Sequence, residues 1–82
     1  DPKKIKKDAK SLLQEFLQSK KIALPKYEVD SIEGEAHLQS FVVQCYIPAL
    51  EIRVKGEGDS RKIAEQVAAK NALIALGKQD GL

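Results

Sequence analysis

The sequence has one cysteine, one histidine and no long apolar run, and each scarcity excludes a class of protein. A single thiol, Cys45, cannot form an intramolecular disulfide, which is typical of a reducing compartment and predicts a cytoplasmic protein. His37 and Cys45 are too few ligands for a zinc site, which takes about four. No stretch approaches the roughly 18 apolar residues of a membrane-spanning helix, and no signal-peptide pattern opens the chain. We therefore expect no membrane partner.

Catalytic and nucleotide-binding motifs are missing as well. Gly56-Glu57-Gly58 precedes a predicted helix but lacks the third glycine of the dinucleotide fingerprint. Gly77-Lys78 is followed by Gln79 and not by the Ser or Thr of a P-loop. Gly56-Glu57-Gly58 instead predicts a flexible turn between a strand and a helix. No pair of acids has a spacing that favours magnesium. Since the motifs for catalysis and nucleotide binding are also missing, we expect no catalytic residue, metal or cofactor in this chain.

What is present fits one small folded domain. Apolar residues make up 43% and charged residues 32% of the 82 positions, as in a globular protein. The net charge of +2 is unevenly placed. Residues 1–30 hold eight Lys against five acids, residues 31–58 two basic residues against four acids, and residues 59–82 four against three. The basic ends favour a polyanionic partner.

The organisation of the chain follows from the same composition. It begins with Asp1 and not with Met, so we expect a segment of a longer protein. Basic residues with little apolar content predict a linker over 1–8. The periodic part predicts a folded domain over 9–77, and residues 78–82 are expected to form a tail.

Hydrophobic periodicity predicts a helix at each end of this domain. The first has about three turns, and we expect Leu24-Pro25 to end it, because the residue before proline avoids the helical region. Its apolar stripe is Ala9, Leu13, Phe16 and Leu17. The second is predicted from Ser60 to Leu76, with Gly77 in the position of a C-cap glycine. Its inner stripe is predicted to be Ala64, Val67, Ala68, Ala72, Leu73 and Leu76.

Alternation of apolar and polar residues predicts three strands between the helices, beginning at Tyr27, Phe41 and Ile52. Gly34 is expected to break the first strand into a loop over 33–39, and Pro48 to end the second at a tight turn. Cys45 falls on the inward face of the second strand. The order predicts an α+β fold, α-β-β-β-α, with two helices packed on one face of a three-stranded antiparallel sheet.

Two polar features of the helices need a cause. Arg61 and Lys62 stand in the first turn of the last helix, after a predicted Ser60 N-cap, where the helix dipole already disfavours cations. Amides, a hydroxyl and two cations at one point would suit a phosphate. On the first helix, a polar stripe can exchange hydrogen bonds with ribose hydroxyls and base edges in the shallow minor groove of A-form RNA. The stripe is Ser11, Gln14, Glu15 and Gln18. The alternatives are an ordinary pair of solvated charges at the start of the last helix and an ordinary solvent-exposed face on the first helix.

Five segments, in this order and at this spacing, resemble the double-stranded RNA-binding domain: Ser11–Gln18, Leu24–Tyr27, Gly34–His37, Phe41–Cys45 and Gly56–Ala69. They are most similar to the C-terminal copy in bacterial ribonuclease III. The resemblance implies three RNA-contacting regions that together span about 16 base pairs. One region enters a minor groove, the second enters the next minor groove, and the third bridges the major-groove phosphates between them. The implied residues are, in that order, Ser11, Gln14, Glu15 and Gln18; Gly34, Glu35, Ala36 and His37; and Ser60, Arg61 and Lys62.

Some positions depart from the family pattern or stay open. His37 either contacts the minor groove or stabilises its own turn. Asp59 and Glu65 stand where the general family often has Lys. The form with Glu65 resembles the ribonuclease III branch, but Asp59 puts a carboxylate beside the phosphates. We therefore expect weaker binding by the isolated domain, on the order of 10⁻⁴–10⁻⁶ M. Lys55 and Lys70 could compensate.

The resemblance also implies a role within a larger protein. The chain would be the non-catalytic, substrate-binding domain of a ribonuclease III endonuclease that processes double-stranded RNA and ribosomal RNA precursors. The parent would be a magnesium-dependent homodimer formed through a separate catalytic domain, and this domain alone would be monomeric. The alternative is a protein-interaction module of the same fold with weak or no RNA binding. Retention of Gln14, Glu15, Arg61 and Lys62 argues against that alternative.

Overall fold

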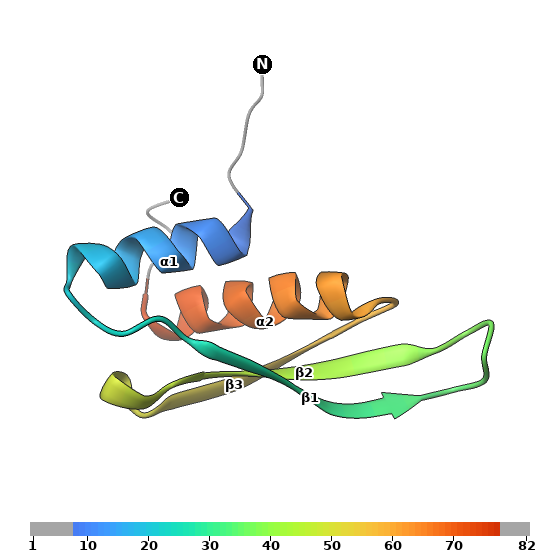
Figure 1. Ribbon diagram of the computed structural model, residues 1–82. Helices are drawn as coiled ribbons and strands as arrows, with labels where there is room; N and C mark the ends of the chain where they lie inside the picture. Colours follow the sequence, from blue (N-terminus) through green and yellow to red (C-terminus); the bar gives the residue numbers. More distant parts are fainter. Residues whose placement is uncertain (1–7, 78–82) are drawn as a thin grey trace, which may run out of the picture.

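The computed structural model describes residues 8–77, which form two helices over one face of a three-stranded sheet (Figure 1). The predicted linker, apart from Asp8, and the predicted tail lie outside the described residues. The elements are α1 (Ala9–Ser19), β1 (Lys26–Glu33), β2 (Ser40–Ile47), the 3-10 turn η1 (Pro48–Leu50), β3 (Ile52–Gly58) and α2 (Arg61–Ala75). The predicted α-β-β-β-α order and the α+β class are confirmed.

The layers are not equivalent, because α2 packs directly on β2 and β3, whereas α1 packs chiefly on α2. Both helices run in the same direction, so that their first turns lie at the same end of the molecule (Figure 1). The position of α1 therefore depends on its contacts with α2.

α1 begins at an Asp8 N-cap, whose carboxylate accepts a hydrogen bond from Ser11 N at 2.8 Å. This bond is the main reason that the pKa of Asp8 is lowered. The expected end at Leu24-Pro25 was wrong. The helix ends at Ser19, and Lys21 adopts the left-handed conformation with φ 59°. Ile22 N then donates a hydrogen bond to Leu17 O at 2.8 Å. The helix therefore ends several residues before Pro25, and the proline does not cause the end.

The sheet has the order β1-β2-β3 and is antiparallel throughout. Its alternation is as predicted, with Val43, Cys45 and Ile47 of β2 fully buried. The register of β1 against β2 shifts between Val29 and Ser31, which leaves Asp30 as a bulge residue.

The glycines at the end of β3 correct the sequence prediction. Gly56 and Gly58 lie within the strand and do not form a turn. A Cβ added at Gly56 would lie 2.1 Å from Ala68 N, and one at Gly58 would lie 2.8 Å from Ala64 N as well as 2.5 Å from Ile63 Cγ2. These positions therefore need glycine because β3 approaches the backbone of α2 closely, and not for flexibility.

α2 has the predicted Ser60 N-cap, which accepts from Ile63 N at 3.1 Å, and Gly77 has the predicted positive φ of 74°. Two predicted stripe residues, Val67 and Leu76, are only half-buried, and of these only Leu76 packs against the core. Ala69, which the prediction left out, is fully buried. Because α2 contacts both the sheet and α1, its buried surface is wider than one stripe.

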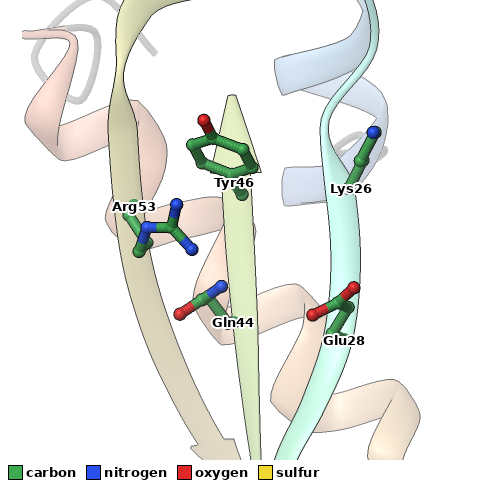
Figure 2. Close-up of a pocket in the computed structure, with 5 residues that line it drawn as sticks. All are labelled: Lys26, Glu28, Gln44, Tyr46 and Arg53. Carbon is green, nitrogen blue, oxygen red and sulfur yellow. The ribbon is translucent and has the colours of Figure 1, made fainter. Parts of the chain in front are cut away.

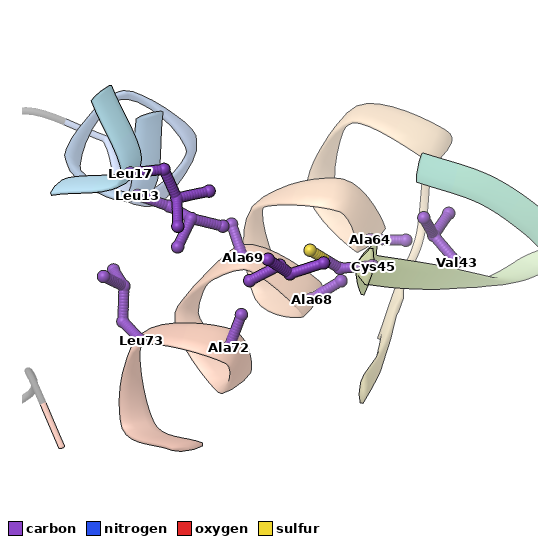
Figure 3. Close-up of a cluster of buried hydrophobic side chains, with 10 residues drawn as sticks. Leu13, Leu17, Val43, Cys45, Ala64, Ala68, Ala69, Ala72 and Leu73 are labelled. Carbon is purple, nitrogen blue, oxygen red and sulfur yellow. The ribbon is translucent and has the colours of Figure 1, made fainter. Parts of the chain in front are cut away.

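The core lies between the layers (Figure 3). Leu13 and Leu17 point from α1 towards Ala69 and Leu73 of α2. Alanines on α2 meet the inner side chains of β2. The fully or almost fully buried apolar residues are Leu13, Leu17, Val43, Cys45, Ile47, Ala64, Ala68, Ala69, Ala72 and Leu73. Burying a leucine in this way stabilises the fold by about 1.5–3 kcal/mol.

Candidate nucleic-acid interface

The polar stripe of α1 is exposed along its whole length. Ser11, Gln14, Glu15 and Gln18 are all solvent-facing, while Leu13 and Leu17 between them are fully buried. The 3.6-residue period of the helix causes this separation. The side chains offer hydroxyl, amide and carboxylate groups, which suit hydrogen bonding to neutral polar groups better than binding to phosphates.

The start of α2 presents cations. Arg61 and Lys62 are exposed, and within residues 8–77 Lys62 forms no ion pair. Ser60 Oγ accepts a bond from Ile63 N, which leaves its O–H available as a donor. The first N–H groups of a helix have no partner within the helix and carry a partial positive charge. An anion is therefore the ligand that suits this helix end.

The first turn of α1 differs, because side chains of the protein already use its amides. Asp8 accepts from Ser11 N, and Gln66 Oε1 accepts from Ala9 N at 2.9 Å and from Lys10 N at 3.4 Å. Of the two helix starts, only that of α2 is suited to an external anion.

The loop between β1 and β2 projects as an exposed turn. Gly34 has φ 93°, and a Cβ there would lie 2.3 Å from Leu38 O, so this position requires glycine. Leu38 N donates to Glu35 O at 2.8 Å and closes the turn. Glu35, Ala36 and His37 are exposed at its tip, followed by Leu38, which is 82% exposed. This turn is closed by a hydrogen bond between backbone atoms, which does not involve the side chain of His37.

The start of α2 lies between the other two regions. Glu65 of α2 joins the first turns of both helices: its Oε1 is 2.6 Å from Lys10 Nζ and its Oε2 is 3.0 Å from Arg61 Nε. Lys10 directly precedes the stripe on α1. On the other side, the loop and Asp59 line one open groove, together with Ser40 at the start of β2. The loop and the start of α2 lie at the same end of the molecule (Figure 1).

In the sequence, Glu65 stood out only as a departure from the general family pattern, and the structure shows what its carboxylate contacts. Its side chain is 14% exposed. The hydrogen bond from Lys10, followed by that from Arg61, keeps the pKa of Glu65 low against the opposing effect of burial. The i,i+4 spacing of Arg61 and Glu65 is a signal that the sequence offered. The contact with Lys10 spans 55 positions and has no local signal.

The outer face of the sheet has a different chemistry (Figure 2). A shallow groove there is lined by Lys26, Glu28, Gln44, Tyr46 and Arg53. The Arg53 guanidinium lies 4.0 Å from the centre of the Tyr46 ring. Further along, Lys55 Nζ pairs with Asp30 Oδ2 at 2.8 Å. Both signs of charge alternate on this face, so it does not form a positive surface.

Among residues 8–77, the titratable groups of Cys45 and Tyr27 lie in or against the core. Burial raises the pKa of the Cys45 thiol, and burial followed by the neighbouring Cys45 raises that of Tyr27. Cys45 is buried on the sheet whereas His37 is exposed in the loop, so the two do not meet. Across residues 8–77 no cluster of three or more His, Cys, Asp or Glu side chains is placed to hold a metal ion. Nor is any helix of this part of the chain long and apolar enough to cross a membrane.

Comparison with known proteins gives consistent matches. The family model of the double-stranded RNA binding motif matches residues 9–76. Ribonuclease 3 of Bordetella pertussis is 60% identical over 75 residues, 92% of this chain and 29% of that protein. Ribonuclease 3 of Ralstonia nicotianae is 62% identical over 73 residues, 89% of this chain and 28% of that protein. The chain thus spans less than a third of the length of these curated relatives.

Solved structures agree with the family match. A structure of Arabidopsis HYL1, described in connection with miRNA processing, aligns with a TM-score of 0.72 and 38% identity, over 85% of this chain and 97% of that one. The paired double-stranded RNA-binding domains of DRB4 align with a TM-score of 0.67 and 29% identity, over 95% of this chain and 50% of that one. With the fold, the motif order and the family match in agreement, the chain belongs to the double-stranded RNA binding motif family.

Proposed function

We propose that this domain binds double-stranded RNA by the shape of its backbone, through α1, the β1–β2 loop and the start of α2. The observation that carries the proposal is the position of the start of α2 between the other two regions. Glu65 contacts Lys10 on α1 and Arg61 on α2, and Asp59 lines one groove with the β1–β2 loop. A-form RNA presents minor groove, major-groove phosphates and minor groove in succession, and about 16 base pairs cover this series.

Each region has a role that suits its chemistry. Ser11, Gln14, Glu15 and Gln18 exchange hydrogen bonds with ribose hydroxyls and base edges of one minor groove. Glu15 acts only as an acceptor of a hydroxyl hydrogen, because a carboxylate beside a phosphate is repelled. Gly34, Glu35, Ala36 and His37 reach the next minor groove.

Ser60, Arg61 and Lys62 bind the phosphates between the two minor grooves. Lys62 provides the least committed charge, since Arg61 already donates through Nε to Glu65. Asp59 is exposed beside this site and weakens it by repulsion of phosphate. Lys55 is held by Asp30 on the outer face, which argues against its acting as a compensating cation.

The whole protein is proposed from its relatives. Their name, Ribonuclease 3, supports a parent ribonuclease of which this chain is the non-catalytic binding domain. We propose that this parent is an endonuclease that processes double-stranded RNA and ribosomal RNA precursors in the cytoplasm. Magnesium and the homodimer contacts would belong to the separate catalytic part. The isolated domain is expected to be monomeric.

The experiment is a fluorescence titration of the domain with a 20-base-pair RNA duplex over a series of salt concentrations. Lys62→Ala should weaken binding to all duplex sequences alike and reduce the slope of log K against log salt by about one unit. Lys26→Ala is the matched control, because it removes the same charge from the outer face of the sheet.

An unchanged slope for Lys62→Ala would remove the phosphate role. If the unsubstituted domain showed no salt-dependent binding even at low ionic strength, RNA binding would be wrong and the protein-interaction alternative would be favoured.

A further inference from the structure

Two consecutive side chains of α2 connect it to the first turn of α1. Glu65 Oε1 accepts from Lys10 Nζ at 2.6 Å, and Gln66 Oε1 accepts from Ala9 N at 2.9 Å. The other carboxylate oxygen of Glu65 accepts from Arg61 Nε at 3.0 Å. One residue therefore contacts a cation from each of the two helix starts that belong to the proposed interface.

Apolar packing alone leaves this helix pair weakly specified. α1 packs chiefly on α2, and Lys10 Nζ, 4.8 Å from the centre of the Tyr27 ring on β1, adds a contact with the sheet at the same first turn. The α2 side of that contact includes alanines, whose small side chains interlock less than larger ones. The apolar contacts of Leu13 and Leu17 are non-directional, so on their own they leave α1 some freedom to rotate or shift. Directional hydrogen bonds at the first turn remove that freedom.

We propose that Glu65, assisted by Gln66, is a positioning residue that fixes the register of α1 on α2 and so sets the separation of the minor-groove stripe from the phosphate site. The inference rests on the proposed function. It assigns a favourable role to a carboxylate that would otherwise only repel RNA. Removing Glu65 should lower the affinity for RNA, because the lost register costs more than the removed negative charge gains.

The sign of that balance gives a sharp test. Glu65→Ala and Asp59→Ala each remove one carboxylate near the start of α2, and only Glu65 contacts α1. Asp59→Ala should tighten binding to a 20-base-pair RNA duplex by about two- to threefold through lost repulsion. Glu65→Ala should weaken it by about three- to tenfold despite the same change of net charge. Glu65→Gln keeps an acceptor for Lys10 and should fall between Glu65→Ala and the unsubstituted domain.

A second measurement separates positioning from stability. Gln14→Ala should weaken binding by about three- to tenfold in the unsubstituted domain. In the Glu65→Ala background it should have a clearly smaller effect, because the stripe is no longer aimed at its groove. Affinities are compared at equal folded fraction, measured by urea unfolding. A role limited to stability leaves the effect of Gln14→Ala the same in both backgrounds.

A third measurement needs no RNA. Residual dipolar couplings of the backbone amides should show α1 reoriented relative to the sheet in Glu65→Ala and unchanged in Asp59→Ala. The proposal is overturned if Glu65→Ala tightens binding as Asp59→Ala does, if the effect of Gln14→Ala does not change, or if α1 keeps its orientation. Failure of the unsubstituted domain to bind would instead remove the proposed function, and the positioning role with it.

Discussion

Replacing Gly56 by alanine tests the contact on which the two-layer arrangement depends. The added Cβ would lie 2.1 Å from Ala68 N, 2.6 Å from Ala64 O and 2.7 Å from Ala68 Cα. All three are backbone atoms, so no side-chain rotation can relieve the overlap, and α2 must move away from β3. Ala64 and Ala68 are both fully buried, so this movement also opens gaps in the core.

The expected cost is about 3 kcal/mol, at the upper end of the range for overpacked cores. For a domain of this size such a loss lowers the Tm by roughly 12–24 °C. Gly77→Ala is the control, because an added Cβ there meets nothing within 4 Å and costs only the strain of φ 74°, about 1 kcal/mol. Urea unfolding followed by circular dichroism measures both. Equal losses in the two variants would refute the close approach of β3 to α2.

The remaining predictions concern a helix cap, a buried thiol and acid stability. Ser60→Ala should lower the free energy of unfolding by about 1 kcal/mol, whereas Ser60→Asp should keep the cap and the stability but weaken RNA binding, as urea unfolding and titration would show. Cys45 should react with a thiol reagent only after unfolding, and rapid labelling of the native domain would contradict its burial. Because the pKa of Glu65 is lowered on folding, its stabilisation is present above the ordinary value of 4.5 and is lost as pH falls through the lowered one. Glu65→Gln should therefore lose less stability than the unsubstituted domain between pH 6 and about pH 3, and equal losses would contradict the ion pairs.

The sequence predicted the element order because each element is locally consistent. The alternation of β2 places Val43, Cys45 and Ile47 on one face whatever the sheet pairs with, and the Ser60 cap acts within three residues. The exposed stripe on α1 was predictable for the same reason, since the period of the helix alone separates it from the buried leucines.

Features that depend on tertiary approach were not predictable. The glycines of β3 were interpreted as a turn because local chemistry cannot reveal that Ala68 lies against Gly56. The end of α1 was placed too late, because Lys21 takes a left-handed conformation that lysine does not favour. The contact between Glu65 and Lys10 links positions 55 residues apart and had no signal in the sequence. Only the i,i+4 pair of Arg61 and Glu65 was visible there.

The most direct measurement is the affinity of the domain for RNA duplexes of increasing length, from about 8 to 24 base pairs, with DNA duplexes of the same sequences beside them. Three regions matched to successive grooves predict a steep rise in affinity up to about 16 base pairs, a shallow statistical rise beyond it, and weaker binding to DNA at every length. An RNA duplex of 8 base pairs that bound as tightly as one of 20, or DNA that bound equally well, would contradict recognition of an A-form duplex by three joined surfaces.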